Sequence, residues 1–245
     1  MLTIAILAGG LATRMQPRTE NIPKSLIEVA GRPFICWQLE SLASMGFRQV
    51  VCCVGHLGEM VQEKVGNGHE FGLSVKYSFD GPSLLGTAGA IRKALPLLGK
   101  EFFVTYGDSL LDCDSHEILK AFRHSRCPAL MVLYRNESLL AQSNAVFMKG
   151  TRAVLYNKKH PHKHSSHIDY GLGVFSASAF LGVRPDVNCD LSDFCGVLSA
   201  RGSLAGHEVH SRFYEIGSPE GLSDTEAFLL ERQAAASSKA AGVRR

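Results

Sequence analysis

The sequence predicts an α/β fold in which helices cover both faces of a mixed, mostly parallel sheet. Through the first half of the chain, short apolar runs of strand length alternate with longer segments whose apolar residues recur at helical spacing. The runs at residues 3–7 and 102–106 are both followed closely by glycine, as buried parallel strands often are where they pass into loops. The alternation favours parallel pairing, because a parallel strand needs a crossover, usually a helix, before its neighbour.

The first elements of the chain show this alternation of strands and helices. A strand over residues 3–7 leads into a glycine pair, and a helix over 33–45 begins at Pro33, whose fixed φ suits a first helical turn. The same alternation predicts strands over 49–54, 74–77, 102–106 and 129–134, and helices over 58–64, 87–98 and 114–126. Asp114 and Glu117 have the spacing of a capping box at the start of the last of these helices.

The second half has a different pattern. Three shorter segments read as antiparallel strands, at 145–148, 153–156 and 170–175, and two segments read as helices, at 190–199 and 219–233. No internal repeat and no linker composition separates the halves, so we expect one domain over residues 1–233. The remaining residues, 234–245, are predicted to be a flexible tail.

Composition excludes several classes of protein. The chain has 245 residues with 26 Lys and Arg against 23 Asp and Glu, an excess too small to indicate nucleic-acid binding. The apolar runs are far shorter than the ~18 residues of a membrane helix, and no basic segment precedes the first run as in a signal peptide. The seven cysteines are an odd number without a C-x-x-C pair, which favours reduced thiols in a cytoplasmic protein.

The loop after the first strand is the strongest candidate for a functional site. Leu7-Ala8-Gly9-Gly10 would let backbone N–H groups approach an anion, although a plain glycine turn is the simpler alternative. Arg14 can make forked contacts to phosphate, and Lys24 offers a compact cation that we expect to lack a protein partner. The loop lacks the G-x-G-x-x-G and G-x-x-x-x-G-K-S/T patterns, which excludes an NAD-linked dehydrogenase and a P-loop enzyme.

The segment from Leu7 to Thr19, followed by Pro23-Lys24-Ser25-Leu26, resembles the signature of the sugar-1-phosphate nucleotidyltransferases, L-A-G-G-x-G-T-R-L-x-P-x-T…P-K-P-L. Thr13, Arg14, Pro17, Thr19 and Lys24 match that signature. Two positions depart from it, because Ala12 stands where glycine is usual and Ser25 where proline is usual. The resemblance continues at Gly31-Arg32-Pro33, Leu85-Gly86-Thr87-Ala88-Gly89-Ala90, Tyr106-Gly107-Asp108 and Phe213-Tyr214-Glu215-Ile216-Gly217.

The resemblance implies a Rossmann-like fold with a nucleotide-binding half, 1–135, and a sugar-phosphate-binding half, 136–233. It implies catalytic roles for Arg14, Lys24 and Asp108, and a Mg²⁺ ion held by Asp108 and Glu215. Glu215 stands where the family has aspartate, and a helix-capping role is its structural alternative. The residues implied to bind substrate are Leu7, Ala8, Gly9, Gly10, Thr13, Gly86, Thr87, Gly89, Gly107, Lys158, Asp169 and Gly171.

The segment Lys158 to His167 is not explained by the family pattern. It holds four histidines among lysines, and three interpretations stay open: a metal site, a basic loop over an anionic ligand, or a solvated surface segment. Neighbouring lysines disfavour a metal because they would repel it.

The reaction implied is NTP plus sugar 1-phosphate giving NDP-sugar and pyrophosphate, with GTP and a heptose or mannose 1-phosphate expected first. A UTP- or CTP-dependent enzyme acting on another sugar phosphate, or on a non-sugar phosphate such as phosphocholine, stays open. So does a non-catalytic nucleotide-binding regulator. A homo-oligomer is possible, and neither nucleic acid nor membrane is expected as a partner.

Overall fold

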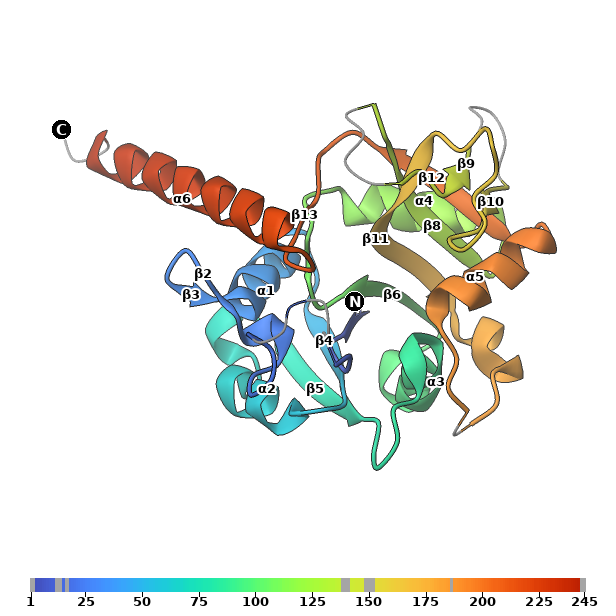
Figure 1. The fold of residues 1–245 in the computed structure, drawn as a ribbon, viewed down its shortest axis with the longest axis horizontal. Helices are drawn as coiled ribbons and strands as arrows, with labels where there is room; N and C mark the ends of the chain where they lie inside the picture. Colours follow the sequence, from blue (N-terminus) through green and yellow to red (C-terminus); the bar gives the residue numbers. More distant parts are fainter. Residues whose placement is uncertain are drawn as a thin grey trace.

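A computed structural model describes residues 3–11, 15, 18–137, 142–147, 153–185 and 187–242 (Figure 1). Within this part of the chain, nine strands form one mixed sheet in which β10-β9-β11-β6-β1-β4-β5 lie in that order and β8 pairs with both β11 and β12. The sheet strands are β1 (Thr3–Leu7), β4 (Gln49–Val54), β5 (Ser74–Phe79), β6 (Glu101–Tyr106), β8 (Ala129–Arg135), β9 (Ala145–Val146), β10 (Leu155–Tyr156), β11 (His167–Ser176) and β12 (Leu204–Val209).

Helices cover both faces of this sheet, as the sequence predicted. They are α1 (Phe34–Ser44), α2 (Gly58–Val65), α3 (Gly86–Leu98), α4 (Ser115–Ser125), α5 (Leu191–Ala200) and α6 (Pro219–Gly242). Apolar residues of α1, α2 and α4 pack on one face together with Ile4 and Ile6 of β1. Those of α3 and α5 pack on the other face with Ala5 and Leu7. Successive β1 residues therefore enter opposite cores, as strand geometry requires.

The parallel half of the sheet brings three strand ends together. β1 pairs in parallel with β4 and with β6, and the register sets Leu7 opposite both Cys53 and Tyr106. The loops that leave these strands all emerge at the carboxyl edge of the sheet. Ligands of open α/β sheets bind at such an edge, where loops rather than strands supply the contacts.

The antiparallel half is built on β11, which pairs with both β6 and β8. Its ladder with β8 is irregular between Asp169 and Gly173. Gly171 lies in this irregular stretch at φ +84°, a conformation that favours glycine.

A small third core fixes the end of the chain against its beginning. Met15 and Ile27 pack with Leu222 and Leu229 of α6, and with Ile216 beside β13 (Tyr214–Glu215). β13 pairs with β7 (Ser109–Leu110), directly after the strand end of β6. Two-residue strands β2 (Glu28–Val29) and β3 (Arg32–Pro33) form a separate ladder nearby. This packing brings residues from both ends of the sequence to one place.

Several elements differ from the sequence prediction, and the largest differences are in β12, β11 and α6. β12 was not predicted, because Leu204–Val209 carries Gly206, His207 and Glu208 and lacks a strong strand pattern, yet it pairs in parallel with β8. β11 begins at His167 rather than at 170. α6 continues to Gly242 instead of ending at 233, so most of the predicted flexible tail is helical, since the segment after 233 is rich in alanine, the strongest helix former.

The cap at the start of α4 follows the prediction. The Asp114 carboxylate accepts the backbone N–H groups of His116 and Glu117 at 2.8 and 3.1 Å and caps α4. All seven cysteines are free thiols. In the described part of the chain, no helix combines the length and hydrophobicity needed to cross a membrane.

Candidate active site

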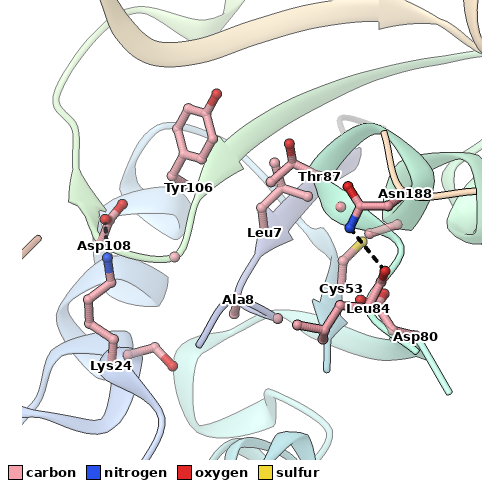
Figure 2. Close-up of a pocket in the computed structure, with 16 residues that line it drawn as sticks. Leu7, Ala8, Lys24, Cys53, Asp80, Leu84, Thr87, Tyr106, Asp108 and Asn188 are labelled. Atoms are coloured by element: carbon pink, nitrogen blue, oxygen red, sulfur yellow. Dashed lines mark hydrogen bonds and ion pairs between the residues drawn. The ribbon is translucent and has the colours of Figure 1, made fainter. Parts of the chain in front are cut away.

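A cavity of about 270 Å³ opens at the carboxyl edge of β1, β4 and β6. Figure 2 shows Lys24 and Asp108 at one end and Asp80, Leu84 and Asn188 at the other, with Ala8 between them. Nine residues predicted from the sequence line this cavity: Leu7, Ala8, Gly9, Gly10, Lys24, Gly86, Thr87, Gly107 and Asp108. The glycine loop, the segment that opens α3 and the end of β6 therefore share one site.

Lys24 and Asp108 form an ion pair at one end of the cavity. Lys24 Nζ lies 2.5 Å from Asp108 Oδ2, and each side chain is 20% exposed. Lys24 lies in a short 3-10 helix, Lys24–Leu26, and Asp108 directly follows β6. The expectation that Lys24 lacks a protein partner is wrong, because the loop folds its ammonium onto the strand-end carboxylate.

Glu215 lies next to this pair. The ladder of β13 and β7 pairs Glu215 with Ser109, and Ile216 N donates to the Asp108 carbonyl at 3.0 Å. A Cβ added to Gly217 would lie 2.6 Å from Glu215 Oε2, 3.1 Å from Asp108 Oδ2 and 3.6 Å from Lys24 Nζ. The two carboxylates and the ammonium therefore converge on Gly217, where no larger residue fits.

The Glu215 carboxylate already has protein partners. Its Oε2 accepts Gly217 N at 2.5 Å and its Oε1 accepts Ser218 Oγ at 2.6 Å, just before α6 begins. Ser218, rather than Glu215, caps α6, because Ser218 Oγ accepts Gly221 N at 3.0 Å. Glu215 supports this cap by accepting the Ser218 hydroxyl. Each carboxylate oxygen can accept more than one hydrogen bond or ligand contact, so these bonds still leave acceptor capacity.

The donor set fits a magnesium ion. Asp108 and Glu215 supply hard carboxylate oxygens beside one glycine, and Asp108 lines the cavity. Among the described residues, no group of three or more His, Cys, Asp or Glu gathers as a metal site. Mg²⁺ is commonly held by only one or two carboxylates, with substrate phosphates and water completing its shell.

Close backbone approach explains the glycines near β1. A Cβ on Gly9 would lie 3.0 Å from Gly55 N, and one on Gly107 would lie 3.0 Å from the Leu7 carbonyl oxygen. Apart from its two chain neighbours, no described residue has an atom within 4 Å of a Cβ built on Gly10. Gly9 and Gly107 therefore let neighbouring segments of the chain pack closely. No described residue crowds Gly10, so its backbone could accept an incoming group.

Gly86 and Gly89 have a packing role that the sequence did not predict. The segment after residue 187 lies against the start of α3, where Ala88 N donates to the Cys189 carbonyl at 2.8 Å and Leu191 N donates to Thr87 Oγ1 at 2.6 Å. A Cβ on Gly86, which has φ +70°, would lie 2.6 Å from the Cys189 carbonyl oxygen. Gly86 lines the cavity, whereas Gly89 is outside its lining and packs against this segment.

Comparison with known proteins matches residues 4–171 to the family model described as nucleotidyl transferase. The chain belongs to the nucleotidyl transferase family. It is similar to the mannose-1-phosphate guanyltransferase of Yarrowia lipolytica, at 28% identity over 91% of this chain and 63% of that protein. It is also similar to the N-acetylmuramate alpha-1-phosphate uridylyltransferase of Neisseria meningitidis, at 43% identity over 44% of this chain and 48% of that protein.

Solved structures confirm the fold of this nucleotidyl transferase. HddC from Yersinia pseudotuberculosis superposes with a TM-score of 0.79 at 19% identity, over 94% of this chain and 100% of that one. The UDP-glucose pyrophosphorylase from Acinetobacter baumannii superposes with a TM-score of 0.71 at 19% identity, over 91% and 92%. The alignments span from about half to under two thirds of the length of the two curated relatives.

The sequence analysis missed four residues that line the far end of the nucleotidyl transferase's cavity: Cys53, Asp80, Leu84 and Asn188. Asp80 directly follows β5, so the strand-end rule that identified Asp108 would also have found it. Asn188 lies in an irregular segment, and nothing local marks it. Its Nδ2 donates to the Leu84 carbonyl at 3.1 Å, which fixes the amide.

A second, much smaller cavity of about 20 Å³ lies beside the first. Tyr106 lines both cavities, and Asp169, Gly171 and Ser192 line the second. Burial raises the pKa of Asp169, while the Gly171 N–H bond at 2.9 Å and the Lys158 cation act to lower it. Asp169 and Gly171, which the resemblance implied to bind the sugar, thus line a cavity that shares Tyr106 with the first one.

Lys158 is exposed and lines neither cavity. Its charge nevertheless acts on Asp169 and on Asp190. Burial is the largest single influence on the pKa of Asp190 and raises it, but the pKa is lowered overall, in part by the charge of Lys158. Bonds from Ser192 add to the lowering. Lys158 therefore lies within electrostatic range of the second cavity.

The histidine-rich segment lies on the surface. His160, His162 and His164 are exposed, and Lys159 Nζ pairs with Asp193 Oδ2 at 2.7 Å. His167 is instead buried, with Nε2 3.0 Å from Glu208 Oε2. Among the described residues, no three or more His, Cys, Asp or Glu side chains gather here as a metal site. The exposed histidines fit a solvated segment, and the influence of Lys158 on Asp169 fits a basic loop over an anionic ligand. Thr13 and Arg14 lie outside the described residues.

Proposed function

We propose that this chain transfers a nucleotidyl group from an NTP to a sugar 1-phosphate and releases pyrophosphate. The observation that carries this proposal is the convergence of Lys24, Asp108 and Glu215 on Gly217, where Lys24 and Asp108 also line one end of the cavity that holds the glycine loop (Figure 2). Catalysis of phosphoryl transfer depends mainly on positioning the substrates and neutralising phosphate charge. A lysine and two carboxylates that can hold a metal ion, close to backbone N–H groups, could do both.

In the proposed reaction, an oxygen of the sugar phosphate attacks the α-phosphorus of the NTP. A new P–O bond forms as the bond between the α- and β-phosphates breaks, and the electron pair leaves with pyrophosphate. Lys24 would neutralise charge on the phosphates as this happens, after its ammonium leaves Asp108. The family resemblance gives Arg14 a similar role.

Asp108 and Glu215 would hold Mg²⁺. When bound, the ion would neutralise phosphate charge and align the two substrates. The open backbone at Gly10 would face the phosphates, and the Tyr106 side chain would separate nucleotide from sugar, since it lines both cavities. Asp169 would accept a sugar hydroxyl in the second cavity, with Gly171 leaving room beside it, and Lys158 would attract the sugar phosphate.

We propose GTP with a heptose or mannose 1-phosphate as the first substrates to test. The guanyltransferase relative aligns over most of this chain, which supports GTP. UTP is the second candidate, because the uridylyltransferase relative has the higher identity over a shorter segment. A cytoplasmic location is supported by the free thiols, and a homo-oligomer can be tested by light scattering.

A pyrophosphate-release assay tests the proposal. Each of the four NTPs would be combined with heptose, mannose, glucose and N-acetylmuramate 1-phosphates, and with phosphocholine. Release that requires both an NTP and one sugar 1-phosphate supports the proposed function. Release with phosphocholine alone indicates the non-sugar alternative. NTP binding without release under any combination contradicts an enzyme and indicates a regulator.

A further inference from the structure

One buried amide bridges the two ends of the turn that carries Asp108. Gly107 and Asp108 form this turn between β6 and β7. Tyr106 precedes the turn and Ser109 follows it. Gln38 Nε2 donates to the Tyr106 carbonyl at 2.7 Å and to the Ser109 carbonyl at 2.7 Å. Both hydrogens of the amide are thus used to join the carbonyls on either side of Asp108.

Gln38 is an unusual residue for its place in α1. It is 1% exposed, whereas glutamine lies mostly at the surface of proteins. The residues of α1 that are buried with it include Ile35, Leu39 and Leu42, which pack in a hydrophobic core. Its Oε1 accepts no hydrogen bond from a described residue. Because an unpaired buried acceptor is unfavourable, any gain from this amide comes through the two bonds to the turn.

The two acceptors also fix the orientation of the amide. If the amide were turned over, its oxygen would face two carbonyl oxygens, which cannot donate to it. Two backbone bonds hold the same turn, since Gly107 N donates to the Leu7 carbonyl at 2.9 Å and Ile216 N donates to the Asp108 carbonyl at 3.0 Å. Gln38 adds a tie made by a side chain, which a substitution can remove.

The direction of the Asp108 carboxylate depends on the geometry of this turn. Figure 2 shows the carboxylate facing the Lys24 ammonium, whose Nζ lies 2.5 Å from Oδ2. Gln38 is absent from the lining of the cavity, so its influence on the site passes through the turn. Hydrogen bonds that support a metal ligand orient it, and their loss typically lowers metal affinity or activity by about 10- to 100-fold.

We propose that Gln38 is a positioning residue, which holds the Asp108 carboxylate in the direction needed to bind a metal ion. This inference rests on the proposed function for the metal role of Asp108. It deepens that function by assigning the support of this carboxylate to one side chain of α1. Gln38 contacts no substrate in this account, and it acts only through its two bonds to the turn.

Ser41 provides a matched control on the same helix. It lies one turn after Gln38, is 7% exposed, and its Oγ donates to the Leu111 carbonyl at 2.6 Å. Ser41→Ala therefore removes a buried bond from α1 without touching the turn that carries Asp108. Gln38→Met keeps the length of the side chain and removes both donors. Gln38→His keeps one N–H, on a ring nitrogen as many bonds from Cβ as the amide nitrogen.

Titration with Mn²⁺ alone, followed by electron paramagnetic resonance, is the first test, because carboxylate sites suit Mn²⁺ as they suit Mg²⁺. Asp108→Asn identifies the Mn²⁺ that binds at this site. Gln38→Met is expected to weaken that binding about tenfold or more, and Gln38→His to weaken it less. Ser41→Ala should leave it unchanged, and thermal melting would compare the stability lost in each variant.

A double-mutant cycle with Asp108→Asn tests whether Gln38 acts through Asp108. In the otherwise wild-type enzyme, Gln38→Met is expected to lower kcat about tenfold, with little change in KM for the NTP. In the Asp108→Asn background it should lower kcat little further, because the carboxylate that it positions is already gone. Equal losses of kcat in the two backgrounds would overturn the proposal.

The binding test has its own contrary results. Wild-type protein that binds no Mn²⁺ at this site, unchanged Mn²⁺ affinity in Gln38→Met, or equal weakening in Ser41→Ala would each overturn the proposal. So would failure of both Gln38 variants to fold, which would make the role of Gln38 structural. Mn²⁺ binding that depends on Gln38, without pyrophosphate release, would reject only the proposed function. Release with unchanged Mn²⁺ affinity in Gln38→Met would reject only the role of Gln38.

Discussion

The Lys24 ammonium and the Asp108 carboxylate lie 2.5 Å apart, although 84 positions separate them in the sequence. Each group is a candidate for a different partner, the ammonium for phosphate and the carboxylate for a metal ion. In the ligand-free protein they neutralise one another, which offsets the desolvation cost of two partly buried charges. In the proposed function, substrate binding would replace this ion pair by two others, Lys24 with phosphate and Asp108 with a metal ion. Each charged group would keep a partner of opposite charge throughout.

Asp108→Asn is expected to lower kcat by on the order of 100-fold or more, because an amide is a poor ligand for Mg²⁺ and cannot balance the Lys24 charge. The fold should persist, since the amide oxygen can still accept from Lys24. Steady-state kinetics beside circular dichroism and thermal melting would check both expectations. Near-normal turnover in a folded variant would remove Asp108 from the catalytic site.

Glu215→Ala is expected to lose both stability and activity. The change leaves Gly217 N and Ser218 Oγ without their acceptor, at a cost of about 1–3 kcal/mol per unsatisfied buried group, reduced where water can enter. Thermal melting would measure this loss.

A Mg²⁺ titration of activity separates the metal role of Glu215 from its structural role. Glu215→Asp restores the usual family residue but withdraws the carboxylate by one methylene. We expect weaker activity that recovers in part at higher Mg²⁺. If Glu215→Ala shows the same half-saturating Mg²⁺ concentration as the parent, Glu215 has only a structural role.

Gly86→Ala is expected to destabilise the protein more than Gly72→Ala. Both glycines have positive φ, +70° and +66°, so both substitutions carry the strain of about 1–2 kcal/mol for a side chain in that region. Only at Gly86 would the new Cβ also meet backbone, 2.6 Å from the Cys189 carbonyl oxygen, whereas Gly72 has open space. Urea unfolding of the two variants measures the difference, and equal losses would contradict the packing role.

Buried thiols are expected to resist modification in the native protein. Burial raises the pKa of Cys52 to about 12, so almost none of this thiol is ionised at pH 8. Cys113, Cys127 and Cys189 are only half-buried, and they should be labelled by iodoacetamide before Cys52. Mass spectrometry of native and urea-unfolded samples would check the order. Rapid labelling of Cys52 in the folded protein would contradict its place within the sheet.

Much of this fold could be predicted because the sequence patterns that indicate its elements lie within short segments of the chain. The apolar run of β1, the spacing of α1 and the Asp114 cap each depend on residues close in the sequence. Asp108 was found by the same reasoning, as a carboxylate at the end of a buried strand. Asp80 has the same position after β5, but the following Gly81 and Pro82 resemble an ordinary turn.

What could not be predicted depends on contacts between distant segments. The Lys24 pair with Asp108 requires the third core, which packs α6 against the N-terminal loop. The packing of Gly86 against Cys189 joins segments about a hundred residues apart. β12 is held by its ladder with β8 rather than by its own composition. In each case tertiary contacts decided the outcome where local propensity was weak.

The central claim is that Lys24 acts on the phosphates during transfer, and Lys24→Ala tests it most directly. The measurement is kcat/KM for this variant beside its equilibrium NTP affinity, with Lys24→Arg as a second variant that keeps the charge but changes its shape. We predict that kcat/KM falls far more than NTP affinity in Lys24→Ala, by on the order of 100-fold, and that Lys24→Arg recovers little of it. Unchanged kcat/KM, or a loss equal to the loss of NTP affinity, would contradict the claim.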